Sequence, residues 1–162
     1  PNPPPLQPID LSETVRNSLV QLTPWLLSKH LELAFEDSAQ PFNIMASPGT
    51  IDIALNNLIT NAVHALEKVP AGARRLRLVL EGHAGHASLT VIDSGPGIPA
   101  AQRARVFEPF YTTRADGLGL GLSLCESLAA GMDGRLELLD RPEPGAAFRL
   151  TLPLAPAQPP QG

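Results

Sequence analysis

The chain has 162 residues, a length that suits one domain with a hydrophobic core. Hydrophobic residues make up 43% of the sequence and charged residues 17%, so the composition is that of a globular protein and excludes a disordered one. The formal net charge of −4 argues against a nucleic-acid-binding protein, which usually carries a basic surface. The cluster Arg74–Arg75–Arg77 is too small to change that conclusion and is expected to be a solvated strand edge.

The single cysteine and the chain ends narrow the class of protein further. Because Cys125 is the single cysteine, no disulfide can form within the chain. It stands in an apolar stretch, so a buried structural thiol is expected. No apolar run reaches the ~18–20 residues that a membrane-spanning helix needs, and the start does not have the pattern of a signal peptide. Because proline is concentrated at both ends, we interpret residues 1–10 as a linker or the cut edge of a longer protein, and 155–162 as a disordered tail.

The first third of the sequence predicts one helix and two strands. Residues 9–30 have helical periodicity, with Ser12 as the expected N-cap and Pro24 expected to kink or split the helix. Residues 31–37 (LELAFED) alternate between apolar and polar side chains and predict a strand, and 41–45 (PFNIM) predict a short partner strand for it.

The remaining elements predict the fold class. A helix is expected from Ser47, as N-cap, and Pro48, at the first helical position, to Pro70. Residues 75–82 and 86–93 predict a hairpin, a second apolar helix is expected over 118–130, and 134–140 and 146–154 predict two more strands. The order favours an α/β two-layer sandwich, in which a mixed, mainly antiparallel sheet of about five strands is covered on one face by about three helices.

A polar stripe follows one side of the predicted helix that contains the segment IDIALNNLITNAVHALEK. Asn57, Asn61, His64 and Lys68 are spaced by four, three and four residues, which places them on one helical face. Such a stripe is often only the solvated side of an amphipathic helix. Asparagine is a poor helix former, however, and its amide oxygen suits Mg²⁺, so the stripe also predicts a ligand site.

Two glycine-containing segments follow. In VIDSGPGIP a predicted strand ends at Asp93, and Gly95 and Gly97 come directly after it; this pattern fits either a tight turn or a carboxylate that accepts a hydrogen bond from a ligand. Gly117, Gly119 and Gly121 precede an apolar helix, where bare backbone N–H groups and the helix dipole favour a phosphate. A flexible hinge is the alternative, and the segment matches neither the P-loop nor the dinucleotide-binding fingerprint.

In this order and spacing, the segments closely resemble the ATP-binding catalytic domain of two-component sensor histidine kinases, in the GHKL superfamily with its Bergerat fold. NNLITNAVHAL resembles the N box, DSGPGI the G1 box, FEPFYTT the F box and GLGLGL the G2 box. The resemblance runs from about Leu11 to Leu154, which is the predicted catalytic domain. It implies ATP and Mg²⁺ as cofactors and transfer of the γ-phosphate to a histidine.

The resemblance also implies a role for each matching residue. Asn61 is expected to coordinate Mg²⁺, Asn57 to support the phosphates beside it, and Asp93 to accept a hydrogen bond from the exocyclic amine of adenine. Asn57 and Asn61 are therefore the expected catalytic residues, and Phe107, Phe110 and Tyr111 are expected to anchor a mobile lid. The expected nucleotide-binding set is Asn57, Asn61, Lys68, Asp93, Gly95, Gly97, Ile98, Thr112, Thr113, Arg114, Gly117, Leu118, Gly119, Leu120, Gly121 and Leu122.

Two departures from the family pattern shape the functional hypothesis. None of the four histidines stands in the phosphoacceptor context of such kinases, so the dimerisation domain that carries that histidine is expected to precede Pro1. The lid between Arg114 and Gly117 is also very short. The expected partners are therefore the missing dimerisation domain and a response regulator, without nucleic acid or direct membrane contact. The fragment is expected to be monomeric and to lie in the cytoplasm. The parent protein is expected to be a homodimer and, like many relatives, an inner-membrane sensor.

Two alternatives remain at this stage. An ATPase resembling DNA gyrase, Hsp90 or mismatch-repair proteins, or an anti-sigma serine kinase, would carry a glutamate as general base four residues before the metal-binding asparagine. This chain has Asn57 at that position, and an amide cannot take up the proton. The second alternative is a nucleotide-sensing or interaction module without transfer activity.

Overall fold

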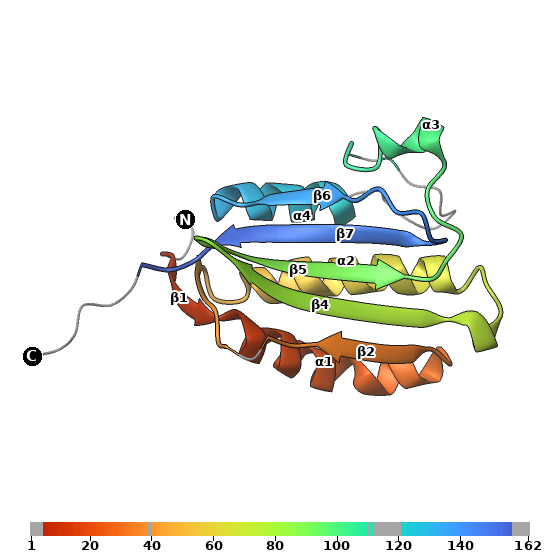
Figure 1. The fold of residues 1–162 in the computed structure, drawn as a ribbon, viewed down its shortest axis with the longest axis horizontal. Helices are drawn as coiled ribbons and strands as arrows, with labels where there is room; N and C mark the ends of the chain where they lie inside the picture. Colours follow the sequence, from red (N-terminus) through yellow and green to blue (C-terminus); the bar gives the residue numbers. More distant parts are fainter. Residues whose placement is uncertain (1–4, 39, 110, 112–120, 157–162) are drawn as a thin grey trace, which may run out of the picture.

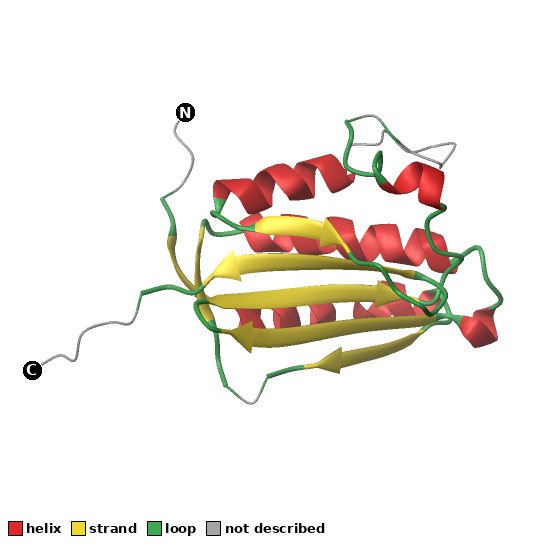
Figure 2. Ribbon diagram, turned by 45° about the horizontal axis from the view of Figure 1, so that its top comes forward, coloured by secondary structure: helices red, strands yellow, loops and turns green. Residues whose placement is uncertain are grey.

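The computed structural model describes residues 5–38, 40–109, 111 and 121–156. A five-stranded sheet has the order β2-β4-β5-β7-β6, in which β2 and β4 are parallel and the other neighbours antiparallel. Figure 1 and Figure 2 show α1, α2 and α4 on one face of this sheet, so the predicted two-layer α/β sandwich is confirmed. The elements are β1 (Gln7–Asp10), α1 (Leu11–Ser28), β2 (Glu32–Glu36), β3 (Asn43–Ala46), α2 (Thr50–Leu66), a 3₁₀ turn (Ala71–Ala73), β4 (Arg75–His83), β5 (His86–Asp93), α3 (Ala100–Arg103), α4 (Gly121–Gly131), β6 (Arg135–Leu138) and β7 (Ala146–Pro153).

The core lies between the helices and the sheet. Leu55, Leu58 and Ile59 of α2 are almost completely buried, as helical spacing predicts, and they share one buried cluster with alternate residues of the sheet such as Leu89 and Val91 of β5. Burial of large aliphatic side chains contributes about 1.5–3 kcal/mol each, which makes α2 the central stabilising helix. No helix among the described residues is both long enough and apolar enough to cross a membrane.

Cys125 confirms the expectation of a structural thiol. It is completely buried in α4 and donates its S–H to the carbonyl oxygen of Ala54 at 3.4 Å, so it links α4 to α2. Burial raises the pKa of the thiol to about 12. The thiolate is therefore absent at neutral pH, and the side chain acts as a small hydrophobic group.

The N-terminal region differs from the sequence prediction in three ways. The N-cap of α1 is Asp10, whose Oδ1 accepts from the N–H of Glu13 at 3.2 Å, and not Ser12. Ser12 is instead buried and donates to Asp37 at 2.6 Å, and the helix continues through Pro24. The segment predicted as the partner of β2 pairs with β1, in a separate two-stranded sheet. Part of the stretch expected to be a linker is therefore a strand.

The start of α2 also differs. The helix begins at Thr50 with Gly49 as N-cap residue, and not with Ser47 as N-cap and Pro48 at the first helical position. Gly49 has φ +82, a left-handed conformation that glycine adopts at little cost, and the carbonyl oxygen of Ser47 accepts from the N–H of Thr50 at 3.1 Å. The chain thus makes one turn before the helix starts.

The hairpin follows the prediction, and the arginine cluster follows it in part. His83 and His86 pair across a two-residue turn whose Gly85 has φ +78. On β4, next to the edge strand β2, Arg75 pairs with Glu32 at 3.3 Å and Arg77 with Glu36 at 2.7 Å, and both arginines are well exposed. The prediction of a solvated strand edge therefore holds only in part: Arg75 and Arg77 are solvated and paired with acidic groups of the edge strand β2, whereas Arg74 is half-buried and donates to the carbonyl oxygens of Val69 at 3.0 Å and Lys29 at 2.8 Å.

Candidate functional site

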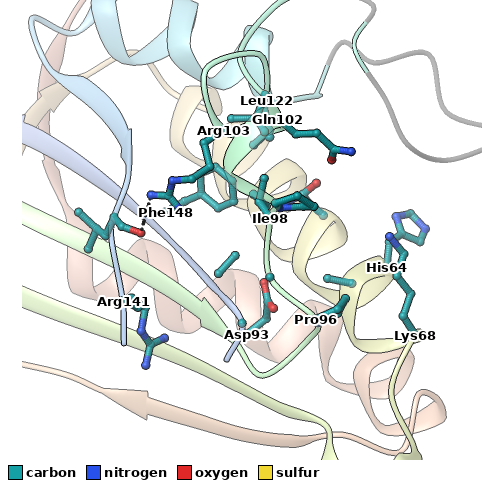
Figure 3. A pocket seen from close by; sticks show the side chains of 18 of the residues that line it. His64, Lys68, Asp93, Pro96, Ile98, Gln102, Arg103, Leu122, Arg141 and Phe148 are labelled. Atoms are coloured by element: carbon teal, nitrogen blue, oxygen red, sulfur yellow. Dashed lines mark hydrogen bonds between the residues drawn. The ribbon is translucent and has the colours of Figure 1, made fainter. Parts of the chain in front are cut away.

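A cavity of about 690 Å³ opens at the end of the sheet where β5 ends and β7 begins. Its walls are α2, the loop after β5, α3, the start of α4 and the loop between β6 and β7 (Figure 3). Its lining residues are Asn57, Thr60, Asn61, His64, Ala65, Lys68, Asp93, Pro96, Gly97, Ile98, Pro99, Gln102, Arg103, Val106, Tyr111, Gly121, Leu122, Leu139, Arg141, Glu143, Pro144, Gly145, Ala146 and Phe148.

The polar stripe of α2 forms one wall of this cavity. Asn57, Asn61, His64 and Lys68 all line it, because the opposite face of the helix is held in the core. The Nδ2 of Asn57 donates to the carbonyl oxygen of Ile53 at 3.0 Å, and its Oδ1 lies beside Gly121 at the start of α4. The Asn61 side chain makes no hydrogen bond with any residue that the structure describes, so its amide oxygen is available to a ligand.

Asp93 lies at the inner end of the cavity and is only 3% exposed. Burial raises the pKa of its carboxyl group above the ordinary value, whereas the backbone N–H groups of Gly95 and Ala146 and the charge of Arg141 act in the opposite direction. The N–H of Gly95 donates to Oδ1 at 2.9 Å. This carboxylate has no ion-pair partner within 4 Å among the described residues, an arrangement that is costly unless a ligand uses it.

Close backbone packing fixes the loop that follows Asp93. A Cβ at Gly95 would lie 2.9 Å from Asp93 Oδ1 and 3.0 Å from the carbonyl oxygen of Ala65, so a larger residue does not fit. Gly97 has φ +81 and faces Gly145, which has φ +109 and lies against the backbone of Asp93. Gly95 itself does not line the cavity; it supports the carboxylate from behind.

The opposite wall was not predicted from the sequence. Arg103 of α3 donates from Nη2 to the carbonyl oxygen of Leu139 at 3.2 Å and pairs with Asp140 at 2.7 Å. Arg141 pairs through Nη2 with Glu143 at 2.6 Å, and its buried Nη1 has no hydrogen-bond partner among the described residues. Arg103 ends α3 and Arg141 follows strand β6, neither stands in a recognisable motif, and only the tertiary fold brings both to the cavity that contains Asp93.

Two of the three expected lid anchors are described by the structure. Phe107 packs edge-on against Phe148 with 6.0 Å between ring centroids. Tyr111 lies under the guanidinium of Arg105, 5.0 Å from the ring centroid, and its buried hydroxyl has no hydrogen-bond partner in the part of the chain that the structure describes. Both rings are thus tied to the cavity wall.

The structure brings most of the described candidate residues together. They come from α2 and the residues after it, from the end of β5 and its following loop, and from the start of α4, and all of them line one cavity: Asn57, Asn61, Lys68, Asp93, Gly97, Ile98, Gly121 and Leu122. Outside the described residues are Phe110, Thr112, Thr113, Arg114, Gly117, Leu118, Gly119 and Leu120, and with them the expected phosphate loop and short lid.

The donor set of the cavity decides which ligand it could hold. No group of three or more His, Cys, Asp or Glu side chains is positioned for a metal ion in the part of the chain that the structure describes. The cavity instead combines amide oxygens with the cationic side chains of Lys68, Arg103 and Arg141. This combination fits an anionic ligand whose own oxygen atoms help to coordinate a hard metal cation.

Residues 47–156 match the family described as "Histidine kinase-, DNA gyrase B-, and HSP90-like ATPase". The chain belongs to this family. Within the family it is similar to sensor histidine kinases, as the four sequence boxes indicated. The C4-dicarboxylate transport sensor protein DctB of Pseudomonas aeruginosa is 35% identical over 147 residues, which cover 89% of this chain and 24% of that protein.

Solved histidine kinases have the same fold. The catalytic domain of histidine kinase ThkA superposes with a TM-score of 0.81 at 26% identity, covering 91% of this chain and 95% of that one; ThkA has also been solved in complex with the response regulator protein TrrA. Full-length ShkA in complex with AMPPNP gives 0.80 at 31% identity, covering 96% of this chain and 32% of that one. The chain spans between about a sixth and a third of the length of the curated relatives that it matches.

Proposed function

We propose that this chain is the nucleotide-binding half of a sensor histidine kinase, which donates the γ-phosphate of Mg²⁺-bound ATP to a histidine on a separate domain. The observation that carries the proposal is the convergence, in one cavity, of a buried carboxylate at Asp93 with the amide stripe of Asn57 and Asn61. A carboxylate accepts hydrogen bonds from an amine, and amide oxygens suit Mg²⁺.

The described residues fit a purine nucleotide. Asp93 lies at the inner end, where it would accept from the exocyclic amine of adenine, and Ile98, Leu122 and Phe148 supply apolar walls around the base. Asn57 lies beside Gly121 at the start of α4, and Asn61 lies one turn further along α2 on the same wall; there they would hold phosphates, with Asn61 as the residue that contacts Mg²⁺. The metal would supply neutralisation of charge on the transferred phosphoryl group.

The catalytic contribution of this chain is positioning. Phosphoryl transfer depends mainly on orientation of the phosphates and on electrostatic stabilisation by fixed groups. Asn57 occupies the position at which hydrolytic relatives are expected to carry a general base, and its amide cannot accept the proton of an attacking water. We therefore expect transfer to a histidine and slow hydrolysis, which disfavours a self-contained ATPase.

The wider assignment follows from what the matched proteins are. We propose residues 11–154 as the catalytic domain, a dimerisation domain with the phosphoacceptor histidine as its first partner, and a response regulator as the next. The complex of ThkA with TrrA supports the second partner. We also propose a homodimeric parent whose catalytic domain lies in the cytoplasm.

The test is calorimetric titration of this chain with ADP and with AMPPNP, each with and without Mg²⁺. The unmodified chain should bind both nucleotides saturably. Asn61→Asp should change the Mg²⁺ dependence of the affinity. Asp93→Asn should lower the affinity by about tenfold to a thousandfold, because the adenine amine loses its matching hydrogen-bond acceptor. The control is Arg77→Gln, which changes an exposed arginine of β4 outside the cavity. This variant should bind as the unmodified chain does. Unchanged affinity in Asp93→Asn and Asn61→Asp would refute the site.

Phosphate transfer needs the missing partner. A dimerisation domain from a similar sensor kinase, added in trans with radiolabelled ATP, should become phosphorylated on histidine. Nucleotide binding without transfer to any such domain, together with absent ATP hydrolysis, would favour the nucleotide-sensing module instead.

A further inference from the structure

We propose that His83 and His86 form a second ligand site on this chain, in which their two imidazole rings chelate one divalent first-row transition-metal cation, such as Cu²⁺, Ni²⁺ or Zn²⁺. This histidine pair lies at the turn between β4 and β5, whereas Asp93 of the cavity stands at the other end of β5. The site is therefore separate from the cavity, and the inference does not depend on the proposed nucleotide-binding function.

Strand pairing holds the two histidines side by side. His83 is the last residue of β4 and His86 is the first residue of β5, and they are register partners across the two-residue turn. Register partners in an antiparallel pair project their side chains to the same face of the sheet, with about 4.5–5.5 Å between their Cβ atoms. Two imidazole rings at this spacing can reach the same cation, because each bond from nitrogen to metal is about 2 Å long.

The histidine pair projects from the sheet face that does not carry the core. Side chains alternate between the two faces along a strand, and Leu78, Leu80 and Leu89 of the same hairpin belong to the core. His83 and His86 have the opposite parity, so they point away from the face on which Figure 2 shows the helices α1, α2 and α4. Both histidines are exposed, so a hydrated cation has access to their rings.

The turn orients one of the two rings for metal binding. Gly85 has φ +78, and its carbonyl oxygen accepts from the N–H of Leu154 at 3.0 Å, which fixes the turn to the residue after β7. The Nδ1 of His86 lies 3.4 Å from the carbonyl oxygen of Ala84. In the tautomer with its hydrogen on Nδ1, the ring donates to this oxygen and keeps the lone pair of Nε2 for a metal. Metal-binding histidines in proteins are commonly oriented by such a bond to a backbone carbonyl.

The donor atoms decide which cation fits the histidine pair. Neutral imidazole suits Cu²⁺, Ni²⁺ and Zn²⁺, with the highest affinity for Cu²⁺, whereas Mg²⁺ prefers oxygen ligands. Glu81 stands two residues before His83 on the same face of β4, and its negative charge attracts cations to this end of the sheet. The pair supplies two protein ligands, because no group of three His, Cys, Asp or Glu side chains is positioned for a metal in the described ranges. Water molecules would therefore complete the coordination shell.

The other two histidines of the sequence are not paired in this way. His64 lies on α2 and lines the cavity, and His30 follows α1, where it is exposed and has φ +53. His30→Asn is therefore the matched control: it removes an exposed imidazole, and asparagine tolerates the left-handed backbone conformation of this position. A site that depends on the histidine pair should not respond to this substitution.

The experiment is a titration of the whole chain, without a polyhistidine tag, with Cu²⁺, followed by electron paramagnetic resonance. In the unmodified chain the tightest-bound Cu²⁺ should show coupling to two imidazole nitrogens. His83→Gln and His86→Gln should each leave coupling to a single nitrogen and weaken Cu²⁺ binding by about a hundredfold, because the second ring no longer binds the same ion. His30→Asn should change neither the spectrum nor the affinity.

Coupling to one nitrogen in the unmodified chain would overturn the proposal. So would an unchanged Cu²⁺ affinity when both substitutions are combined, because that result would show adventitious binding elsewhere on the surface. A second measurement needs no variant: substoichiometric Cu²⁺ should broaden the backbone amide NMR signals of residues 82–87 before those of other residues, and broadening centred elsewhere would also count against the site. Neither readout involves a nucleotide, so failure of this site and failure of the proposed function are distinguishable.

Discussion

The two sides of the cavity are built in different ways. The end of β5 is fixed from below: Asp93 is almost completely buried, hydrogen-bonded to backbone and clamped between glycines. The part of the β6–β7 loop that precedes Gly145 is instead held by ion pairs of exposed acidic groups, Asp140 with Arg103 and Glu143 with Arg141. The first side has one conformation set by sterics, and the second is held by contacts that solvent and salt weaken.

This difference predicts which side of the cavity fixes the position of a ligand. Packing at the end of β5 fixes where a ligand would be held, because backbone cannot move there without disturbing the sheet. The ion pairs of the loop instead involve exposed groups, so their loss should disturb the position of the ligand less. The two sides should therefore respond differently to substitution, and the predictions below test this from the largest expected effect to the smallest.

Gly145→Ala should be the most damaging change. Gly145 has φ +109, and an added Cβ would overlap the carbonyl oxygen of Asp93, so strain and overpacking should together cost about 3–5 kcal/mol of stability. Gly85→Ala is the matched control: φ is +78 but nothing lies within 4 Å of the Cβ, so only about 1–2 kcal/mol should be lost. Denaturant unfolding measures both, and equal losses would show that the clamp at Asp93 is not steric.

Asp93→Asn should separate binding from stability. Burial raises the pKa of Asp93 in the folded state, so the native protein binds this proton more tightly and loses stability as the pH rises from about 4 through that pKa. The stability of Asp93→Asn relative to the unmodified chain should therefore increase with pH, even though nucleotide binding is weakened. Thermal unfolding at a series of pH values measures this difference.

Asp37 provides the opposite sign in the same experiment. Hydrogen bonds from Ser12, from the backbone of Ser38 and from Arg16 lower the pKa of Asp37 against the effect of its burial, so its contribution is present at neutral pH and is lost on acidification. Asp37→Asn should therefore be destabilising at neutral pH and progressively less so in acid. The same pH trend in both asparagine variants would contradict the assignment of either carboxylate.

Asp140→Asn should have the smallest effect. Its side chain is 98% exposed, and an exposed ion pair contributes about 0–1 kcal/mol that salt reduces further. Arg103→Ala should cost more, because it also removes the hydrogen bond to Leu139, worth about 1 kcal/mol. Unfolding at low and high salt compares them. A salt-independent loss above about 2 kcal/mol for Asp140→Asn would place this loop with the rigid side of the cavity.

Local patterns in the sequence predicted what local physics determines. The alternation in 75–82 and 86–93 and the two-residue turn fix the hairpin, and the glycines after Asp93 identified the end of β5. The α2 stripe was equally visible, because helical spacing alone places Asn57 and Asn61 on one face. The fold class followed from the order of these elements and is confirmed by the structure.

Features that depend on distant contacts could not be predicted. Nothing in the segment 41–45 indicates that β3 pairs with β1 rather than with β2. The cap of α1 went to Asp10 because Ser12, the other candidate, is turned inward to Asp37. Arg141 had no recognisable signal in the sequence. It reaches the cavity only because β7 pairs with β5, and no local pattern in the 52 residues between these two strands predicts that pairing.

The pairing of β1 with β3 also has a mechanical consequence. In Figure 1 both ends of the described chain emerge at the end of the sheet opposite the cavity, where β3 joins β1 and also meets Leu154 through a single bridge. A pulling force applied between the two ends would load these few backbone hydrogen bonds first. They would part before the force reached the strand ends around Asp93, so tethering the chain at either terminus should leave the cavity intact.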